Sequence, residues 1–538
     1  MKRKLRFLTA LALVLALLAG CSGGKTLGEK VAELQSQREG SGPRVTNETL
    51  VYERPDGEEL ERLLDAACEA SENGTAEEIL DAVWEYYDAY DWFYTYYALA
   101  DIRYSADLTD PYWEEEYSFC AEMATEVEEG LERLNRTLAK SPRREELEAE
   151  FFGEGFFEDY DGESLWDAEF TWLLEEETRL QNRFYELSAE ENGEPGTRAW
   201  YDACADDRAQ VLVDLIGVRQ QMADHWGYDT YAEFAWDFYY YRDYTPEQAS
   251  AYYDRIRQEL VPLYRESADS DAWDEIYRSA KSDATFAYVR DTSKAMGGTV
   301  WEAFCLLEEG QLYDIAPGEN KYTTSFEVYL TSYGVPFLFM CPDGTRYDYL
   351  TFAHEFGHFC SDYAAGGSYA GVDVSEVFSQ GMEYLSLCYG GSEALSRAKL
   401  ADSLATYVEQ AAFGSFEQRM YELEGEELSV EGLYALYEEV ALEFGFDAVG
   451  YDRREFVEVN HYYTNPMYIV SSVVSNDAAM QLYQRELEER GAGVELLEKN
   501  LATEEGYFLA FVDAAGLESP FAPGRLESVR ELFMEADV

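Results

Sequence analysis

The sequence predicts a mostly α-helical protein with two lobes, and three observations lead to this fold class. Long stretches of the chain repeat apolar residues at three- and four-residue spacing, which is the period of a helix face. Helix-capping patterns open at least two of these stretches, whereas alternating strand patterns are rare. The 538 residues are 47% hydrophobic and 15% aromatic, which is enough to bury a substantial core.

Two helix starts are predicted by capping boxes. Thr75 is followed three residues later by Glu78, and apolar and tyrosine residues then recur at helical spacing as far as Tyr97. Residues 245–248 combine a capping threonine, a proline at the first helical position and a returning glutamine. We therefore expect one helix after Thr75, with an aromatic face that packs in the core, and another after residue 245.

The clearest strand pattern lies at Val335–Met340. A turn at residues 342–344 and a helical pattern from Asp348 to Ala365 follow it directly. Because Pro336 cannot donate a backbone hydrogen bond, we expect this strand at the edge of a small sheet. An extended peptide could then add to the strand through backbone pairing.

Residues 1–20 have the layout of a bacterial secretory signal, with four basic residues ahead of an apolar run from Phe7 to Ala19. This run is too short to span a bilayer. The sequence Leu18-Ala19-Gly20-Cys21 resembles the lipobox of bacterial lipoproteins, which implies that Cys21 becomes the acylated first residue. Several acyl chains on one cysteine would anchor the protein stably. An ordinary cleaved signal is the alternative.

Residues 21–50 are polar and poor in large apolar side chains, so we expect a flexible tether there. The expected location is extracytoplasmic, and the lipid on Cys21 would be the only contact with a bacterial membrane. The chain has 41 Lys and Arg against 109 Asp and Glu, a formal net charge of −68, so anionic lipid should repel the body. The same charge excludes nucleic acid as a partner, because phosphate-binding surfaces need cationic patches.

A possible metal site lies on the predicted helix, in the sequence His354-Glu355-Phe356-Gly357-His358. Two histidines four residues apart lie about one turn apart on the same helix face, where both can reach one zinc ion. Glu355 would take a proton from the zinc-bound water as that water attacks a peptide carbonyl. The alternative, two histidines in the core, is less probable because the chain has only four histidines.

A catalytic zinc needs a third protein ligand, and Glu376 is the best candidate. It follows the break at Gly366-Gly367, which would end the first helix and let a second one pack beside it. From spacing alone, the more usual interpretation of a glutamate near a helix start is a surface residue that the helix dipole favours.

Several segments resemble the thimet oligopeptidase and oligoendopeptidase F family of zinc peptidases. Residues 335–358 and 376–383 look like its catalytic core. The segments similar to the oligoendopeptidase F branch are Tyr104–Asp107, Asp110–Pro111, Arg219–Ala223, Gly227–Tyr231 and Arg242–Pro246. Together the resemblance covers roughly residues 90–480.

The resemblance implies a two-lobed oligopeptidase fold with a deep channel. We expect an N-terminal helical region at residues 51–204 and a zinc peptidase catalytic region at residues 205–538. The family pattern of a glutamate followed by x-x-Ser-Gln matches Glu376, which implies that Glu376 is the third ligand of one zinc ion per chain. Glu383, two helical turns later, would support the metal ligands from behind.

The family also places a histidine and tyrosines opposite the zinc, and residues 461–468 look like that element. This implies that His461, with Tyr463 or Tyr468, stabilises the oxyanion of the tetrahedral intermediate. A capped or buried imidazole is the alternative for His461. The chain departs from the family at Ser472, in a run where a second tyrosine is usual.

The function predicted from these features is a zinc-dependent endopeptidase that hydrolyses internal bonds of short peptides, with Glu355 as general base. The departure at Ser472 motivates one alternative, a zinc-containing peptide-binding lipoprotein without turnover. A second alternative is an exopeptidase similar to dipeptidyl carboxypeptidases. It would need a group that fixes the terminal carboxylate of the substrate, and no sequence motif identifies one.

Overall fold

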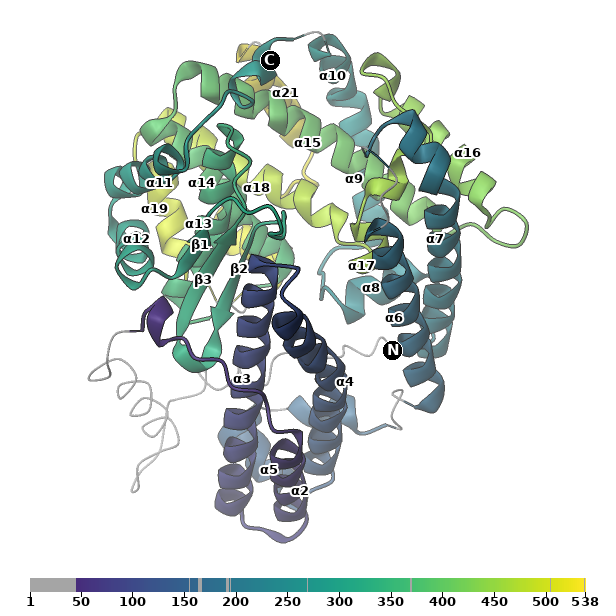
Figure 1. Ribbon diagram of the computed structural model, residues 1–538, viewed down its shortest axis with the longest axis vertical. Coiled ribbons are helices and arrows are strands. Elements are labelled where there is room, and N and C mark those ends of the chain that lie inside the picture. The colour runs from purple at the N-terminus through teal and green to yellow at the C-terminus, as the bar shows by residue number, and fades with distance from the viewer. Residues whose placement is uncertain are drawn as a thin grey trace. The chain divides into compact units, whose positions relative to one another are not determined.

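The computed structural model describes residues 45–153, 155–162, 167–189, 193, 195–268, 270–367, 370–503, 505–536 and 538. The predicted signal, Cys21 and nearly all of the predicted tether therefore lie outside the described residues. The prediction of a mostly α-helical fold with a small sheet is confirmed (Figure 1). In the part of the chain that the structure describes, none of the helices combines the length and apolar character needed to cross a membrane.

The described residues form two compact units. The first unit takes its residues from 1–163, 280–369 and 501–504, and the second from 164–279, 370–500 and 505–538. Helix α7 (Arg198–Trp226) belongs to the second unit.

The main elements of the first unit are α2 (Gly57–Asn73), α3 (Ala76–Ala106), α4 (Pro111–Ala139), α5 (Arg144–Leu147), α11 (Ser282–Met296), α12 (Gly298–Gly310), β1 (Tyr313–Ile315), β2 (Phe326–Leu330), β3 (Val335–Met340) and α13 (Tyr347–Ala365). Those of the second unit are α6 (Ala168–Ala189), α7, α8 (Tyr231–Phe238), α9 (Pro246–Glu259), α10 (Val261–Ser267), α14 (Val372–Gly390), α15 (Glu393–Met420), α16 (Val430–Glu443), α17 (His461–Thr464), α18 (Ile469–Glu488), α19 (Ala492–Asn500), α20 (Phe508–Ala514) and α21 (Arg525–Glu535).

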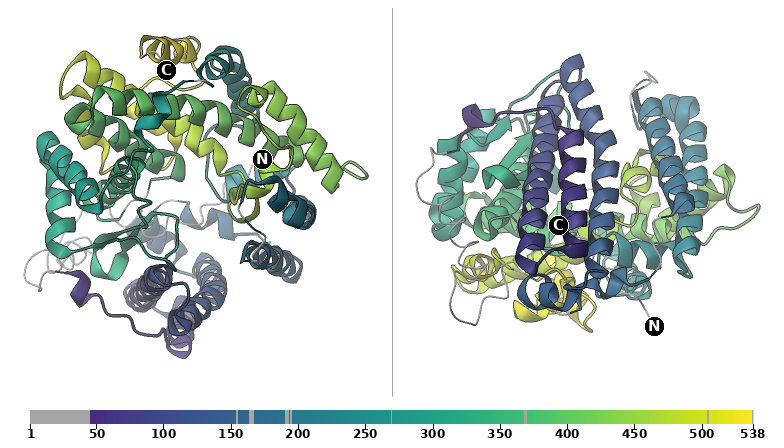
Figure 2. Two further views of the ribbon diagram at one scale, coloured as in Figure 1. Left: turned by 45° about the horizontal axis from the view of Figure 1, so that its top comes forward. Right: turned by 90° about the horizontal axis from the view of Figure 1, so that it is seen from below.

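Helices α2, α3 and α4 of the first unit lie side by side (Figure 2). The predicted capping box opens α3: the backbone N–H of Thr75 donates to Glu78 Oε2 at 2.9 Å, and the backbone N–H of Glu78 donates to Thr75 Oγ1 at 3.3 Å. On the predicted aromatic face of α3, Tyr87 is buried in the core, while Tyr90 and Tyr94 are partly buried and pack against it.

The small sheet has the strand order β1-β3-β2, so the prediction that Val335–Met340 forms an edge strand is wrong. Strand β3 is central, parallel to β1 and antiparallel to β2. Pro336 is tolerated because β1, which is parallel to β3, begins at Tyr313 opposite Leu338, so only β2 pairs with β3 at the proline. The edges of this sheet are β1 and β2.

The turn between β3 and α13 is held at both ends by charged side chains. Lys321 Nζ donates to the carbonyl oxygen of Met340 at 2.9 Å and pairs with Asp314 Oδ1 at 2.8 Å. Asp348, in the first turn of α13, accepts the backbone N–H groups of Asp343 and Gly344 at 3.0 Å each. These contacts determine where the helix begins after the strand.

Helix α18 of the second unit packs against α14 and α15. Helices α14 and α18 approach closely at Gly381, where a Cβ would lie 2.7 Å from Leu482 Cδ1 and would displace that side chain. The second predicted capping box opens α9, where Thr245 and Gln248 exchange hydrogen bonds. Helices α6 and α7 form a further packed pair, as Figure 1 shows.

Candidate metal centre

Helix α13 carries both predicted histidine ligands and the predicted base. The imidazoles of His354 and His358 lie one turn apart, with ring centroids separated by 5.2 Å and ring planes inclined by 78°. Both rings are half-buried, and Glu355 between them is only 7% exposed. The helix follows the turn after β3 and ends at Ala365, where Gly366 takes the left-handed conformation (φ +71°) that terminates many helices.

Glu376 lies in the second turn of α14 and is largely buried. Both of its carboxylate oxygens accept hydrogen bonds from neutral hydroxyl groups. Ser379 Oγ donates to Oε2 at 2.8 Å, and the Tyr468 hydroxyl donates to Oε1 at 2.6 Å. These two donors orient the carboxylate, as outer partners of metal-binding carboxylates do.

The side chains of His354, His358 and Glu376 offer ligand atoms that all lie within 4.8 Å of one another. Among the described residues, this is the one cluster of three or more such side chains that could hold a metal ion. Two imidazoles and one carboxylate are a donor set typical of catalytic zinc, which also keeps an open position. The residues present therefore fit the predicted zinc ion.

His461 and Tyr468 lie next to each other, with their rings stacked at a centroid distance of 4.9 Å. His461 keeps an exposed surface, yet desolvation by the surrounding protein lowers its pKa, and the nearby Glu376 carboxylate acts in the opposite direction. Burial and the Glu376 carboxylate raise the pKa of Tyr468 well above its usual value. The Tyr468 hydroxyl therefore stays protonated and acts as a hydrogen-bond donor.

Tyr463, the other tyrosine considered for the oxyanion role, lies in the core of the second unit. It is completely buried, and its ring stacks on Phe184 at 3.9 Å. Its hydroxyl donates to the carbonyl oxygen of Arg208 at 3.4 Å. Of the two tyrosines, Tyr468 is therefore the one that contacts the candidate ligand Glu376.

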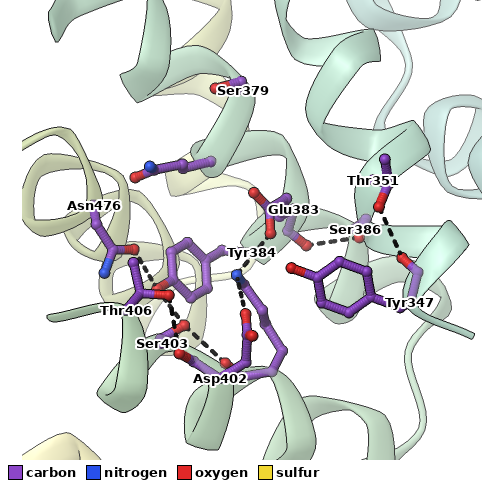
Figure 3. Close-up of polar contacts among 12 residues, drawn as sticks. Tyr347, Thr351, Ser379, Glu383, Tyr384, Ser386, Asp402, Ser403, Thr406 and Asn476 are labelled. Atoms are coloured by element: carbon purple, nitrogen blue, oxygen red, sulfur yellow. Dashed lines mark hydrogen bonds and ion pairs between the residues drawn. The ribbon is translucent and has the colours of Figure 1, made fainter. Parts of the chain in front are cut away.

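Glu383 lies two turns after Glu376 on α14 and forms an ion pair with Lys399 Nζ at 2.7 Å. Lys399 is buried and also contacts Asp402 Oδ2 at 3.0 Å. Figure 3 shows this polar group, in which the neighbouring Tyr384 hydroxyl lies close to Ser403 and Asn476. The network connects α14 to α15 and α18, two helical turns after the candidate ligand Glu376.

Asp373, which was not among the residues predicted from the sequence, lies one turn before Glu376 on α14. Asp373 is buried and accepts hydrogen bonds from Arg242 Nε at 3.1 Å, from the Tyr244 hydroxyl at 2.8 Å and from Ser471 Oγ. Two features of the sequence could have indicated Asp373. Its partners Arg242 and Tyr244 lie in a segment that resembles the peptidase family, and Asp373 lies on the same helix face as Glu376.

Glu327 and Asp362 are two further acidic residues of the first unit that were not predicted from the sequence. Burial raises the pKa of Glu327, on β2, well above its usual value, and the carboxyl groups of Asp362 and Glu355 act in the same direction. Asp362 lies four residues after His358, so helical spacing could have indicated it. Nothing in the sequence around Glu327 pointed to this position.

Comparisons with known proteins agree with this architecture. Residues 48–163 match the Peptidase M3 N-terminal domain. A structure described as oligoendopeptidase F superposes with a TM-score of 0.78 at 20% identity, over 92% of this chain and 99% of the other. For PZ peptidase A with an inhibitor, the TM-score is 0.76 at 18% identity, over 90% and 98% of the two chains. An oligoendopeptidase F structure from Bacillus anthracis strain Ames gives a TM-score of 0.74 at 20% identity, over 92% and 99%.

No curated protein matches the chain. The resemblance identified from the sequence motifs is nevertheless confirmed by the match of residues 48–163 and by the likeness of the whole fold. The chain thus carries an M3 peptidase N-terminal domain and has the fold of oligoendopeptidase F.

Proposed function

We propose that this protein is a zinc-dependent endopeptidase that hydrolyses internal bonds of short peptides. The observation that carries the proposal is the convergence of the ligand atoms of His354, His358 and Glu376, with Glu355 on the same helix as the two histidines. The likeness to oligoendopeptidase F structures supports the same conclusion. The ion would be held by the two imidazoles and the Glu376 carboxylate.

When bound, zinc would supply Lewis acidity to the substrate carbonyl and to water. Glu355 would accept the proton of the attacking water and later deliver it to the leaving amine. His461 and the neutral Tyr468 hydroxyl, whose rings lie side by side, would donate to the carbonyl oxygen as it gains negative charge. Because the Tyr468 hydroxyl has one proton and donates it to Glu376 in this structure, it would turn from Glu376 to the carbonyl oxygen during the reaction. Glu383, held by Lys399, would keep α14 and thereby Glu376 in position.

An extended peptide is the proposed substrate form. Backbone pairing with a sheet edge would give affinity without demanding particular side chains. Since β3 is central, the added strand would pair with β1 or β2 rather than with β3. We expect peptides of about 6 to 20 residues to be cut, because an extended chain advances roughly 3.3 Å per residue and must reach from the sheet edge past the metal.

A peptide-binding protein without turnover is the second candidate, and the residue at position 472 favours it. Ser472 occupies a run in which related peptidases usually have a tyrosine, and its carbonyl oxygen accepts a hydrogen bond from Gln380 Nε2 at 3.3 Å. A serine cannot reach as far as a tyrosine hydroxyl. If Tyr468 alone did not suffice for the oxyanion, the protein would bind peptides and release them intact.

One experiment separates these candidates. The protein from residue 45 onward is analysed for metal content and incubated with a length series of unstructured peptides, and the products are identified by mass spectrometry. Internal cuts that disappear in Glu355→Gln but persist in Glu393→Gln, a control at an exposed position, support the endopeptidase. Bound but intact peptides would support the second candidate, and cuts confined to the C-terminal end would indicate an exopeptidase.

We also propose that the chain is a lipoprotein anchored outside the cytoplasm through Cys21. The lipobox-like sequence at residues 18–21 supports this, together with the polar segment that follows it. The anchor would hold the peptidase at the membrane surface while the acidic body stays away from anionic lipid.

A further inference from the structure

Met467, directly before the oxyanion candidate Tyr468, has a left-handed backbone conformation with φ +66°. The side chain is buried, being 1% exposed. A residue other than glycine adopts this conformation at an energetic cost and keeps it only where the surrounding structure enforces it. Such residues concentrate at functional sites.

Two buried charged side chains hold the backbone of Met467. Its N–H donates to Glu417 Oε1 at 2.7 Å, and its carbonyl oxygen accepts from Arg242 Nη1 at 2.9 Å. Glu417 is 2% exposed and Arg242 is 7% exposed. Both peptide groups that flank the left-handed residue are therefore fixed by hydrogen bonds with buried side chains, and the bond from the Arg242 guanidinium group is charge-assisted.

Arg242 also connects this residue to the helix that carries Glu376. Its guanidinium group contacts Asp373 at 3.1 Å and donates to Ser471 Oγ at 2.8 Å. Asp373 lies one turn before Glu376 on α14, and Ser471 lies in the first turn of α18. One side chain thus connects α14, Met467 and the start of α18.

Side chains also hold the backbone of the preceding residues 462–466. Arg219 donates to the carbonyl oxygens of Tyr462 and Tyr463 at 2.6 and 2.5 Å. The Tyr240 hydroxyl donates to the carbonyl oxygen of Pro466 at 2.8 Å. Arg219 is completely buried and is paired with Glu177. These contacts leave Arg242 and Glu417 as the two side chains that hold the turn at Met467.

We infer that Arg242 and Glu417 are positioning residues, which hold Met467 in its left-handed conformation so that the Tyr468 hydroxyl lies against Glu376. If Met467 relaxed to negative φ, the direction of the chain into Tyr468 would change and the 2.6 Å contact with Glu376 would be lost. The catalytic consequence rests on the proposed function, whereas the effect on the position of Tyr468 does not.

The test uses 3-fluorotyrosine at position 468 and fluorine NMR of the metal-free protein. Arg242→Met should shift or broaden the fluorine signal, and in the zinc-loaded protein it should lower kcat at least tenfold with KM within twofold. Glu417→Ala should do the same. Glu417→Gln keeps a carbonyl oxygen for the Met467 N–H, and its signal and kcat should resemble those of the unmodified protein.

Arg525→Met is the matched control. Arg525 is buried and paired with Asp477 at 2.7 Å in the same unit, and its guanidinium group donates to Asp477 and Gln484 on α18. It should lower the unfolding temperature like Arg242→Met while leaving the fluorine signal and kcat unchanged. If Arg242→Met and Arg525→Met changed the unfolding temperature, the fluorine signal and kcat equally, Arg242 would contribute only to general stability. That result would overturn the inference.

Met467→Gly provides a rescue, because glycine adopts positive φ without strain. In the Arg242→Met background, Met467→Gly should restore part of the original fluorine signal. Absence of any restoration would overturn the role assigned to the left-handed conformation. This double variant and Arg242→Lys also keep the inference testable if Arg242→Met alone does not fold. If the unmodified protein cuts no peptide, the proposed function fails, and the fluorine signals still decide the positioning role.

Discussion

The Tyr468 hydroxyl donates a 2.6 Å hydrogen bond to Oε1 of Glu376, although 92 residues separate the two in sequence. The contact joins the candidate third metal ligand on α14 to the segment that precedes α18. It also keeps the phenol next to the ligand cluster, where a donor could serve the reaction. Glu376 accepts a second hydrogen bond from Ser379, so the orientation of its carboxylate is determined from two sides.

The two glutamates of the site should respond differently to removal of their charge. Glu376→Gln removes a ligand, so zinc retention should fall together with activity. Glu355→Gln should keep the metal while kcat falls by about 10² to 10⁴, because the base is lost and the ligands are not. Metal analysis after dialysis and steady-state kinetics measure both effects. Equal zinc loss in both variants would contradict this division of roles.

Removal of the hydroxyl group should affect turnover differently at the two candidate tyrosines. Tyr468→Phe should lower kcat by about 10² to 10³, which is typical for the loss of one oxyanion donor, and should spare zinc. Tyr463→Phe is the matched control, because the Tyr463 hydroxyl donates to the carbonyl oxygen of Arg208 in the core of the second unit. It should change stability slightly and leave kcat unaltered. A larger loss of kcat in Tyr463→Phe than in Tyr468→Phe would reverse the assignment.

Glu417 should make the stability of the protein depend on pH. Burial raises its pKa to about 7, while hydrogen bonding from Met467 and the charges of Arg219 and Arg242 oppose the shift. The folded state therefore keeps a proton that the unfolded chain releases near pH 4.5, and the free energy of unfolding falls as pH rises from there to 7. The loss is at most about 3 kcal/mol, since one pKa unit corresponds to about 1.4 kcal/mol.

Urea unfolding of Glu417→Gln between pH 5 and 8 measures this contribution. The variant cannot ionise at this position and keeps the carbonyl oxygen that accepts the Met467 N–H, so its free energy of unfolding should fall less steeply with pH. Glu488→Gln, at an exposed position, is the control and should keep the original slope. An unchanged slope in Glu417→Gln would show that this carboxyl group does not govern the pH dependence.

Lipid attachment can be tested on the full chain in a bacterial host. The native sequence should incorporate labelled fatty acid and fractionate with membranes, because several acyl chains on one cysteine give stable anchoring. Cys21→Ser should lose the label and appear in the soluble fraction. Cys68→Ser is a control at another cysteine and should change neither result. Labelling that persists in Cys21→Ser would refute the proposed anchor.

The sequence by itself determined the helical character of the protein and the position of the helix that carries His354 and His358. Capping chemistry and apolar periodicity are local properties, so the helix starts after Thr75 and Thr245 and the helix at His354–His358 could be predicted from neighbouring residues. The family pattern that pointed to Glu376 includes Ser379, three residues later in the same helix. These two side chains form a hydrogen bond. Such patterns need no knowledge of distant parts of the chain.

Only the tertiary structure decided which distant residues support the site. Pro336 pointed to an edge strand, but β1 is too short to reach the proline, and β3 is central. Arg242 meets Asp373 across 131 residues and Met467 across 225, and none of these pairs leaves a local pattern. The choice of Tyr468 over Tyr463 likewise depends on which side chain the turn at Met467 directs toward Glu376. Long-range packing and a single backbone torsion angle decide that direction, and neither can be obtained from the spacing of residues along the chain.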